Sequence, residues 1–267
     1  MVMAQHSEEK VAVYSGTRNL YDHMETASKS LVANSQIDRV VLLIEDDKFP
    51  HELPGFFETM NVAKQGYFTS DGANWNTPYT YMSLMRATYS KLFPDLSKIL
   101  QLDVDTIVVD DLGVLWDIDL SGYYFAAVEE KLGTWGPKNF GMDKYYNIGV
   151  AMFNLDEIRK DGADDEIIRY LNKKHFKYID QDAWNYVGDA KCLSLSARYN
   201  ETFCTGYTEN PAVVHYASGN IRNWWEDIHI PRLEYIKKYR EMTWDDVIWN
   251  RKSLYADKME RPLHGFE

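Results

Sequence analysis

The chain has 267 residues, 45 % of them hydrophobic, and a formal net charge of −12. This length suffices for one large domain or two small ones with a substantial core. The negative charge argues against nucleic-acid binding, because nucleic-acid binders carry basic patches that neutralise phosphate.

The two cysteines form no metal-binding spacing and indicate no disulfide framework, which favours a reduced compartment. The polar N-terminus lacks the apolar core of a signal peptide, so we expect a cytoplasmic location. No stretch approaches the ~20 apolar residues of a membrane span. We therefore expect no span, while peripheral membrane association stays open.

The first part of the chain predicts a βαβ unit. Residues 10–14 and 40–44 have the pattern of buried strands, and residues 24–33 between them have helical spacing. Such a unit implies parallel strands and a right-handed crossover. Ligands bind beyond the carboxyl ends of strands in such sheets, which is where the loop Ser15–Asn19 would lie.

A helix is expected to begin at Thr77 as N-cap, with Pro78 at its first position, and to end near Phe93. It carries Arg86, an isolated cation among apolar residues. Most such arginines extend to solvent, so a surface salt bridge is the alternative to a functional role.

Residues 99–109 form an apolar run that is interrupted by Asp103-Val104-Asp105. The run predicts a strand in the middle of a sheet. Residues two apart on an extended chain point the same way, so Asp103 and Asp105 would present two carboxylates to one side. Buried carboxylates repel each other, and a divalent cation that takes oxygen ligands relieves this repulsion. An Asp pair that caps a turn is the alternative.

The rest of the chain predicts one α/β domain, residues 10–225, with a mostly parallel central sheet flanked by helices. A C-terminal helical extension follows at residues 226–267. The expected strands are 123–128, 146–154 and 212–216, and the expected helices are 155–160 and 165–173. Residues 179–182 are expected to precede a further short helix through Trp184 and Val187. Residues 131–144 are expected to form a loop.

These pieces, in this order, resemble the retaining glycosyltransferases of family 8. The family's metal motif is similar to Leu100–Val108, and its Asn-x-Gly-Val block to Asn147–Leu155. An Asp-Gln-Asp block matches residues 180–182, and a His-x-x-Gly block is similar to residues 215–224. The resemblance covers about residues 10–225 and implies a Rossmann-like GT-A domain.

The chain departs from the family in two places. The family's first loop usually carries an Asp that contacts uracil, near the position of Thr17, so the base preference stays open. The last block has one extra residue, and Arg222-Asn223-Trp224 replaces Lys-Pro-Trp. An arginine can still pair with a diphosphate.

The resemblance implies roles for particular residues. Mn²⁺, with Mg²⁺ as the alternative, would be held by Asp103, Asp105 and His215, and the catalytic residues would be Gln181, Asp180 and Arg86. The donor-binding residues would be Tyr14, Ser15, Thr17, Asn19, Arg86, Val104, Asn147, Asp180, Gly219 and Arg222. Acceptor binding is assigned to Glu129 and Trp224, with Trp135 and Trp225 as further stacking candidates. The alternatives are a structural role for His215 and helix N-capping by Asp180 or Asp182.

The resulting hypothesis is a metal-dependent retaining hexosyltransferase. Its donor would be a UDP-sugar, UDP-glucose or UDP-galactose, and its acceptor a glycan, glycolipid or glycoprotein. Gln181 is a poor nucleophile, which favours front-face displacement over a covalent intermediate. One alternative is a haloacid-dehalogenase-type phosphohydrolase, whose motif is similar to Asp103–Thr106 but normally opens the chain. The other is a non-catalytic sugar-binding protein of the same fold.

Overall fold

A seven-stranded sheet organises the computed structural model, which describes residues 9–77, 79–131, 135–217 and 232–260. The strand order is β3-β2-β1-β4-β7-β6-β8. The strands are β1 (Val11–Ser15), β2 (Arg39–Ile44), β3 (Phe57–Asn61), β4 (Lys98–Leu102), β6 (Phe125–Glu129), β7 (Tyr146–Asn154) and β8 (Cys192–Leu195). Four of the six neighbouring pairs are parallel, and β7 runs antiparallel to both β4 and β6. The predicted mostly parallel α/β sheet is confirmed.

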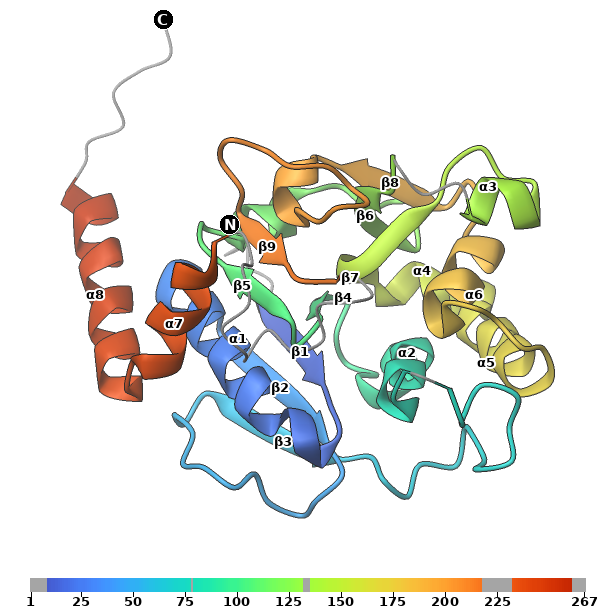
Figure 1. The fold of residues 1–267 in the computed structure, drawn as a ribbon, viewed down its shortest axis with the longest axis horizontal. Helices are drawn as coiled ribbons and strands as arrows, with labels where there is room; N and C mark the ends of the chain where they lie inside the picture. The colour runs from blue at the N-terminus through green and yellow to red at the C-terminus, as the bar shows by residue number, and fades with distance from the viewer. Residues whose placement is uncertain (1–8, 78, 132–134, 218–231, 261–267) are drawn as a thin grey trace, which may run out of the picture.

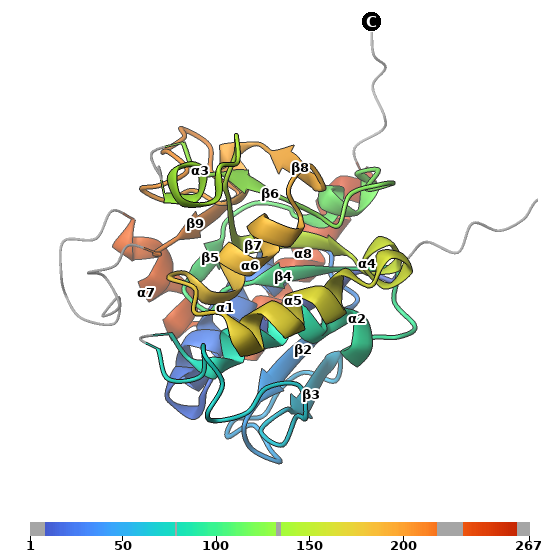
Figure 2. The same cartoon turned by 90° about the vertical axis from the view of Figure 1, so that its right-hand side faces the viewer.

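Helices cover both faces of this sheet, as Figures 1 and 2 show. On one side lie α1 (Tyr21–Asn34), α7 (Leu233–Glu241) and α8 (Trp244–Glu260). On the other lie the 3₁₀ helix η2 (Tyr81–Thr88) and α2 (Tyr89–Leu92), α4 (Leu155–Asp161), α5 (Ala163–Lys173) and α6 (Ile179–Val187). The short helices η1 (Arg18–Leu20), η3 (Gly113–Asp117), α3 (Trp135–Phe140) and η4 (Ala197–Tyr199) lie in connections.

Alternation along the strands divides the core between these two helical layers. In β1, Ala12 and Tyr14 pack with α1, whereas Val11 and Val13 pack with η2 and α5. This follows because successive side chains on a strand point to opposite faces. A sheet covered on both faces needs apolar residues at every position, and all six residues of β2 except Arg39 are buried.

The C-terminal helices share the core of the sheet. Ile236, Tyr239 and Val247 are buried in the same cluster as α1, and Arg251 donates a hydrogen bond to the carbonyl of Ile37 at 2.6 Å. The helical character predicted for this region is confirmed. The predicted boundary between residues 225 and 226 lies outside the described residues.

A second, two-stranded sheet pairs β5 (Thr106–Val108) with β9 (Val213–His215) in antiparallel fashion. The apolar run 99–109 is therefore two strands in two sheets, not one strand as expected. The reason is the turn at Asp103, whose carbonyl accepts hydrogen bonds from the N–H of Thr106 at 3.2 Å and from its hydroxyl at 2.6 Å.

The helix predicted from Thr77 to Phe93 is wrong in its first half. The segment is instead η2 followed by a single α-helical turn, α2, and Thr77 makes no helix N-cap there. Tyr81 at the start of η2 stacks on Trp75 with ring centroids 4.3 Å apart. The tighter 3₁₀ winding thus accommodates tertiary contacts that local propensity does not register. Pro78 lies outside the described residues.

Among the strands and α-helices of the described residues, β3, β8 and α3 were not predicted. The strands β3 and β8 form the two edges of the sheet and are only partly buried, so they lack a continuous apolar run. The helix α3 falls in the segment that was expected to be a loop because of its glycines. No helix of the described residues is long and apolar enough to cross a bilayer.

Candidate active site

Two aspartates and a histidine meet beyond the carboxyl end of β4. Asp103 follows β4 directly, and its N–H donates to the carbonyl of Gly149 at 2.7 Å. The turn then leads into β5, where Thr106 lies opposite His215 of β9. As a result, the ligand atoms of Asp103, Asp105 and His215 all lie within 4.8 Å of one another. The two sheets thus bring together residues that are far apart in the sequence.

The three groups are electrostatically coupled. The Nε2 atom of His215 lies 3.2 Å from a carboxylate oxygen of Asp105 and 3.6 Å from one of Asp103. Burial acts to lower the pKa of His215, but the charges of Asp105 and Asp103 raise it above its ordinary value. Burial raises the pKa of Asp103; for Asp105, His215 outweighs burial and the pKa lies below its usual range. The two carboxylates therefore increase the proton affinity of the imidazole.

The residues around this cluster fit a divalent cation. The Nδ1 atom of His215 lies 2.7 Å from Oδ1 of Asn200, which leaves Nε2 directed at the two carboxylates. A Cβ atom on Gly149 would lie 2.1 Å from Cε1 of His215 and 2.9 Å from Oδ2 of Asp103. Only glycine at this position leaves room for the histidine and the acid side by side. Two carboxylates with one imidazole suit Mn²⁺ or Mg²⁺.

Arg86 of η2 lies inside the protein with its side chain 10 % exposed, and does not extend to solvent. Its guanidinium donates to Oδ2 of Asp180 at 2.7 Å and to Oδ1 of Asp103. Its Nε atom is buried and has no hydrogen-bond partner among the described residues. The surface salt bridge, the alternative for Arg86, is wrong. The arginine instead joins Asp103, at the end of β4, to Asp180 of α6.

The start of α6 separates the roles of its two aspartates. Asp182 accepts a hydrogen bond from the N–H of Tyr178 at 2.9 Å and one from Nε1 of Trp135 at 3.2 Å. Asp182 thus binds the N–H of Tyr178, the N-cap residue of α6, from within the helix. The N-capping alternative for Asp180 or Asp182 is wrong, because both residues lie inside the helix. Asp180 faces Arg86 instead, and burial raises its pKa to about 6.

A hydrogen-bond network extends from His215 to Gln181. Asn200 donates to Oδ1 of Asn147 at 2.8 Å, and Asn147 donates to Glu130 at 2.9 Å. Gln181 also donates to Glu130, at 3.2 Å, and to the hydroxyl of Tyr145 at 3.1 Å. Burial raises the pKa of Glu130. Asn147 and Gln181 thus share Glu130 as a hydrogen-bond partner, and Asp180 precedes Gln181 on α6.

Glu130, Asn200 and Gly149 are site residues that the sequence analysis did not assign. Glu129 was assigned in place of its neighbour; its carboxylate lies 3.6 Å from the ammonium of Lys144 near the surface. The sequence at the end of this strand does not indicate which of the adjacent residues Glu129 and Glu130 points into the protein. Gly149 lies within the Asn-x-Gly-Val block. The glycine in that block was a signal that another side chain packs closely against the backbone there.

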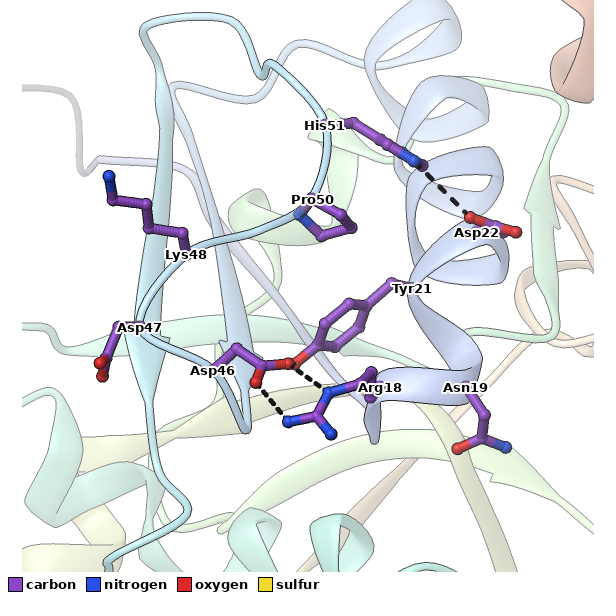
Figure 3. Close-up of a pocket in the computed structure, with 9 residues that line it drawn as sticks. All are labelled: Arg18, Asn19, Tyr21, Asp22, Asp46, Asp47, Lys48, Pro50 and His51. Atoms are coloured by element: carbon purple, nitrogen blue, oxygen red, sulfur yellow. Dashed lines mark hydrogen bonds and ion pairs between the residues drawn. The ribbon is translucent and has the colours of Figure 1, made fainter.

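The loop after β1 borders a second feature, an open pocket of about 710 Å³. Figure 3 shows Arg18 paired with Asp46 beside Tyr21, with Asn19 on the same loop. The Nε atom of Arg18 donates to Asp46 at 2.9 Å, and the hydroxyl of Tyr21 donates to Asp46 at 3.0 Å. Because β1 is parallel to β4, this pocket and the Asp103 turn lie at the same edge of the sheet.

The remaining predicted donor residues are partly placed. The side chain of Tyr14 is buried in the core, and its hydroxyl donates to the carbonyl of Ala27 at 3.3 Å, so only its main chain can serve a ligand. The hydroxyl of Thr17 donates to Oδ1 of Asn19 at 2.7 Å. Val104 lies close to Gly16 of the same loop as Ser15. Gly219, Arg222, Trp224 and Trp225 lie outside the described residues.

A rigid turn beside the network exposes two aromatic rings. The hydroxyl of Thr205 donates to the carbonyl of Asn200 at 2.5 Å, and the N–H of Gly206 donates to the carbonyl of Thr202 at 3.0 Å. Phe203 and Tyr207 are 60 % and 65 % exposed. The turn is thus anchored on the residue that orients His215.

Comparisons with known proteins agree with this geometry. The model of a family described as glycosyl transferase family 8 matches residues 21–227. The chain is 30 % identical over 146 residues to a putative glycosyltransferase of Haemophilus influenzae, which covers 50 % of this chain and 44 % of that protein. It is 28 % identical over 198 residues to general stress protein A of Bacillus subtilis, covering 61 % and 68 %. The chain thus spans less than half of the first relative.

Solved structures share the fold. The glycosyltransferase GlyE of Streptococcus pneumoniae superposes with a TM-score of 0.70 at 20 % identity, covering 97 % of this chain and 66 % of that one. The galactosyltransferase LgtC, in complex with donor and acceptor sugar analogues, superposes with a TM-score of 0.66 at 20 % identity, covering 90 % and 99 %. At these identities the likeness establishes the GT-A fold.

Proposed function

Because this chain belongs to glycosyl transferase family 8, we propose that it is a metal-dependent glycosyltransferase that moves a hexose from a UDP-sugar to a glycan-bearing acceptor. The observation that carries the proposal is the convergence of Asp103, Asp105 and His215 within 4.8 Å at the sheet edge that the β1 loop also borders. An edge of this kind is where α/β sheets bind nucleotides.

Asp103, Asp105 and His215 would hold Mn²⁺ or Mg²⁺. Bound there, the cation supplies Lewis-acid stabilisation of the negative charge that develops on the leaving diphosphate. Asn200 keeps the imidazole oriented through Nδ1. Arg86 supplies a fixed positive charge next to Asp103 without needing to reorganise.

The donor would extend from this cluster toward the loop after β1. Ser15, Thr17 and Asn19 would contact the nucleoside, together with Val104 and the main chain of Tyr14. The open pocket beside Arg18 gives the nucleoside end space at the same edge. Gly219 and Arg222 would make further contacts to the diphosphate.

The sugar itself would lie between Arg86 and the network around Gln181. Asn147, Asp180 and Gln181 offer both donors and acceptors to sugar hydroxyls. Glu130 accepts a hydrogen bond from the side-chain amide of Gln181 and so orients it. No carboxylate takes the place of Gln181, and an amide is a poor nucleophile, so we propose transfer with retention by front-face displacement.

The acceptor would approach over Glu129, Trp224 and the turn that carries Phe203 and Tyr207. Exposed aromatic rings on a rigid turn stack on sugar rings with little loss of conformational entropy. The support for this placement is the hydrogen bond that anchors the turn to Asn200.

The test is a panel of sugar nucleotides with MnCl₂, in which release of nucleoside diphosphate is measured. We expect turnover with UDP-glucose or UDP-galactose, loss of turnover with EDTA, and loss in Asp105→Asn. The matched control is Asp95→Asn, an exposed aspartate outside the site, which should keep full activity.

Two further readouts separate the alternatives. NMR of the product should show the donor's anomeric configuration; inversion contradicts the proposed mechanism. Phosphate release from an aryl phosphate with Mg²⁺, without any sugar transfer, would instead support a phosphohydrolase. A folded protein that turns over no donor at all would contradict the proposed activity and favour the alternative, a non-catalytic sugar-binding protein.

A further inference from the structure

Two lysines are seated on aromatic rings around α3. The ammonium of Lys177 lies 4.2 Å from the ring centroid of Trp135, the first residue of α3. The ammonium of Lys174 lies 5.6 Å from the ring of Phe140, the last residue of α3, and 5.0 Å from that of Tyr186. Cation–π contacts of this kind fix a flexible lysine in one place. We call Lys174, Lys177 and these rings the lysine–aromatic patch.

The backbone that carries these lysines is also fixed. The buried amide of Asn74 donates to the carbonyls of Leu171 and Lys174, at 2.6 and 2.7 Å, and accepts from the N–H of Phe176 at 2.9 Å. Three hydrogen bonds from one side chain hold the link between α5 and α6. The two ammonium groups are therefore presented on a rigid support.

Both lysines lack an anionic partner. They are exposed, and neither pairs with a carboxylate or donates a hydrogen bond to any of the described residues. Their ammonium groups thus contact aromatic rings and not carboxylates, although the chain has 41 acidic and 29 basic residues. An ammonium on a ring keeps its N–H groups free for an anion.

The patch connects to the candidate active site through short contacts. Trp135, under Lys177, donates to Asp182, and Tyr145 donates to the same carboxylate. Tyr145 in turn accepts a hydrogen bond from Gln181. Lys177 also precedes α6, the helix that carries Gln181, by a few residues. Figure 1 shows α3, α5 and α6 together on the side opposite α7 and α8.

We propose that the lysine–aromatic patch binds the anionic groups of an acidic acceptor, a glycan or polyol chain that bears phosphates or carboxylates. The inference rests on the proposed function and names its acceptor class. The cations lie at both ends of α3, about 9 Å of helix, which suits a chain with repeated charges better than one free anion. Of the rings in the patch only that of Tyr186 is exposed, at 39 %, so a membrane surface that takes up several aromatic side chains is disfavoured.

The experiment measures binding of fluorescently labelled polymers to the whole protein: poly(glycerol phosphate), polygalacturonate and neutral dextran. We expect the wild type to bind at least one anionic polymer, more weakly as salt rises, and not dextran. The double variant Lys174→Glu/Lys177→Glu should bind at least tenfold more weakly, and Lys174→Gln/Lys177→Gln should be intermediate. Lys252→Glu, an exposed lysine on α8, is the matched control and should bind as the wild type does.

Three outcomes overturn the proposal: no anionic polymer bound by the wild type, equal binding by the double glutamate variant, or binding only to vesicles of phosphatidylcholine and phosphatidylglycerol. Binding of poly(glycerol phosphate) would identify phosphate as the recognised group, and binding of polygalacturonate would identify carboxylate. Hydrolysis of the UDP-sugar in the absence of acceptor, measured on the same variants, should not change. Polymer binding without any hydrolysis of a UDP-sugar would support the lysine–aromatic patch as a binding site and contradict the proposed glycosyltransferase function.

Discussion

The Oδ1 atom of Asn200 lies 2.7 Å from Nδ1 of His215, and this contact determines which imidazole nitrogen faces Asp103 and Asp105. An amide oxygen accepts from Nδ1–H, so the neutral imidazole offers Nε2 as a ligand. The same amide donates to Asn147 on β7. One side chain therefore connects the proposed metal site to the hydrogen-bond network around Gln181.

Replacement of Asn200 by alanine should weaken Mn²⁺ binding. The imidazole loses its orienting partner, and loss of such a partner costs roughly 10–100-fold in metal affinity. Calorimetric titration with MnCl₂ measures the effect. Asn210→Ala, at an exposed asparagine nearby in the chain, is the control and should bind as the wild type does. Unchanged affinity in Asn200→Ala would show that the contact does not orient the ligand.

Replacement of Gly149 by alanine should disrupt the same site from the opposite side. The added Cβ would lie 2.1 Å from Cε1 of His215, so the imidazole or β7 must shift. Overpacking of this kind costs about 1–3 kcal/mol in the free energy of unfolding. We expect a lower urea midpoint together with weaker Mn²⁺ binding. Gly55→Ala, where nothing lies within 4 Å of the new Cβ, should change neither quantity.

Asp180 should make the stability of the metal-free protein depend on pH. Burial, followed by the charge of Asp103, raises the pKa of Asp180 to about 6 from an ordinary value of 3.8, although Arg86 opposes the shift. Between these values the folded state binds more protons than the unfolded state, so this contribution to stability is present at low pH and lost as pH rises through about 6.

The measurement is the urea midpoint with EDTA across this pH range, compared between the wild type and Asp180→Asn. The asparagine variant cannot ionise and should lack the decline. The wild type should fall relative to it by up to on the order of 1.4 kcal/mol for each unit of pH. A wild type that instead gains stability relative to the variant as pH rises would contradict the shift.

Glu130 should set an acidic limit on turnover. It accepts hydrogen bonds from Gln181 and Asn147, which favours the ionised carboxylate, while burial raises its pKa. Protonation as the pH falls would loosen Gln181 and lower kcat. Glu130→Gln should lower kcat on the order of tenfold or more and flatten the acidic limb of the pH–rate profile.

The same substitution at the neighbouring residue tests the sequence prediction. Glu129→Gln should leave the acidic limb in place, because the carboxylate of Glu129 lies beside Lys144 and forms no hydrogen bond to this network within the described part of the chain. An effect on the KM of the acceptor alone would support its predicted acceptor role. A flattened profile in Glu129→Gln, with a normal profile in Glu130→Gln, would reverse the two assignments.

Local sequence patterns were sufficient to predict an element whose own residues determine its structure. The strand Tyr146–Asn154 and the helix that ends at Gly162 were predicted closely, because continuous apolar runs and a C-terminal glycine are local features. The helix predicted from Thr77 failed because Arg86 and Tyr81 form hydrogen bonds with residues distant in the sequence, Asp180 and Glu45. Edge strands failed because they are only half-buried.

The sequence by itself determined the fold class, the family and the residue types of the site, since these depend on apolar periodicity and on short blocks such as Asp103-Val104-Asp105. Only the tertiary structure decided that Arg86 is buried against Asp180, that Glu130 and not Glu129 holds Gln181, and that Gly149 makes room for His215. The physical reason is that these are contacts between different strands and helices, and a distance across a sheet leaves no trace in the spacing of residues along the chain.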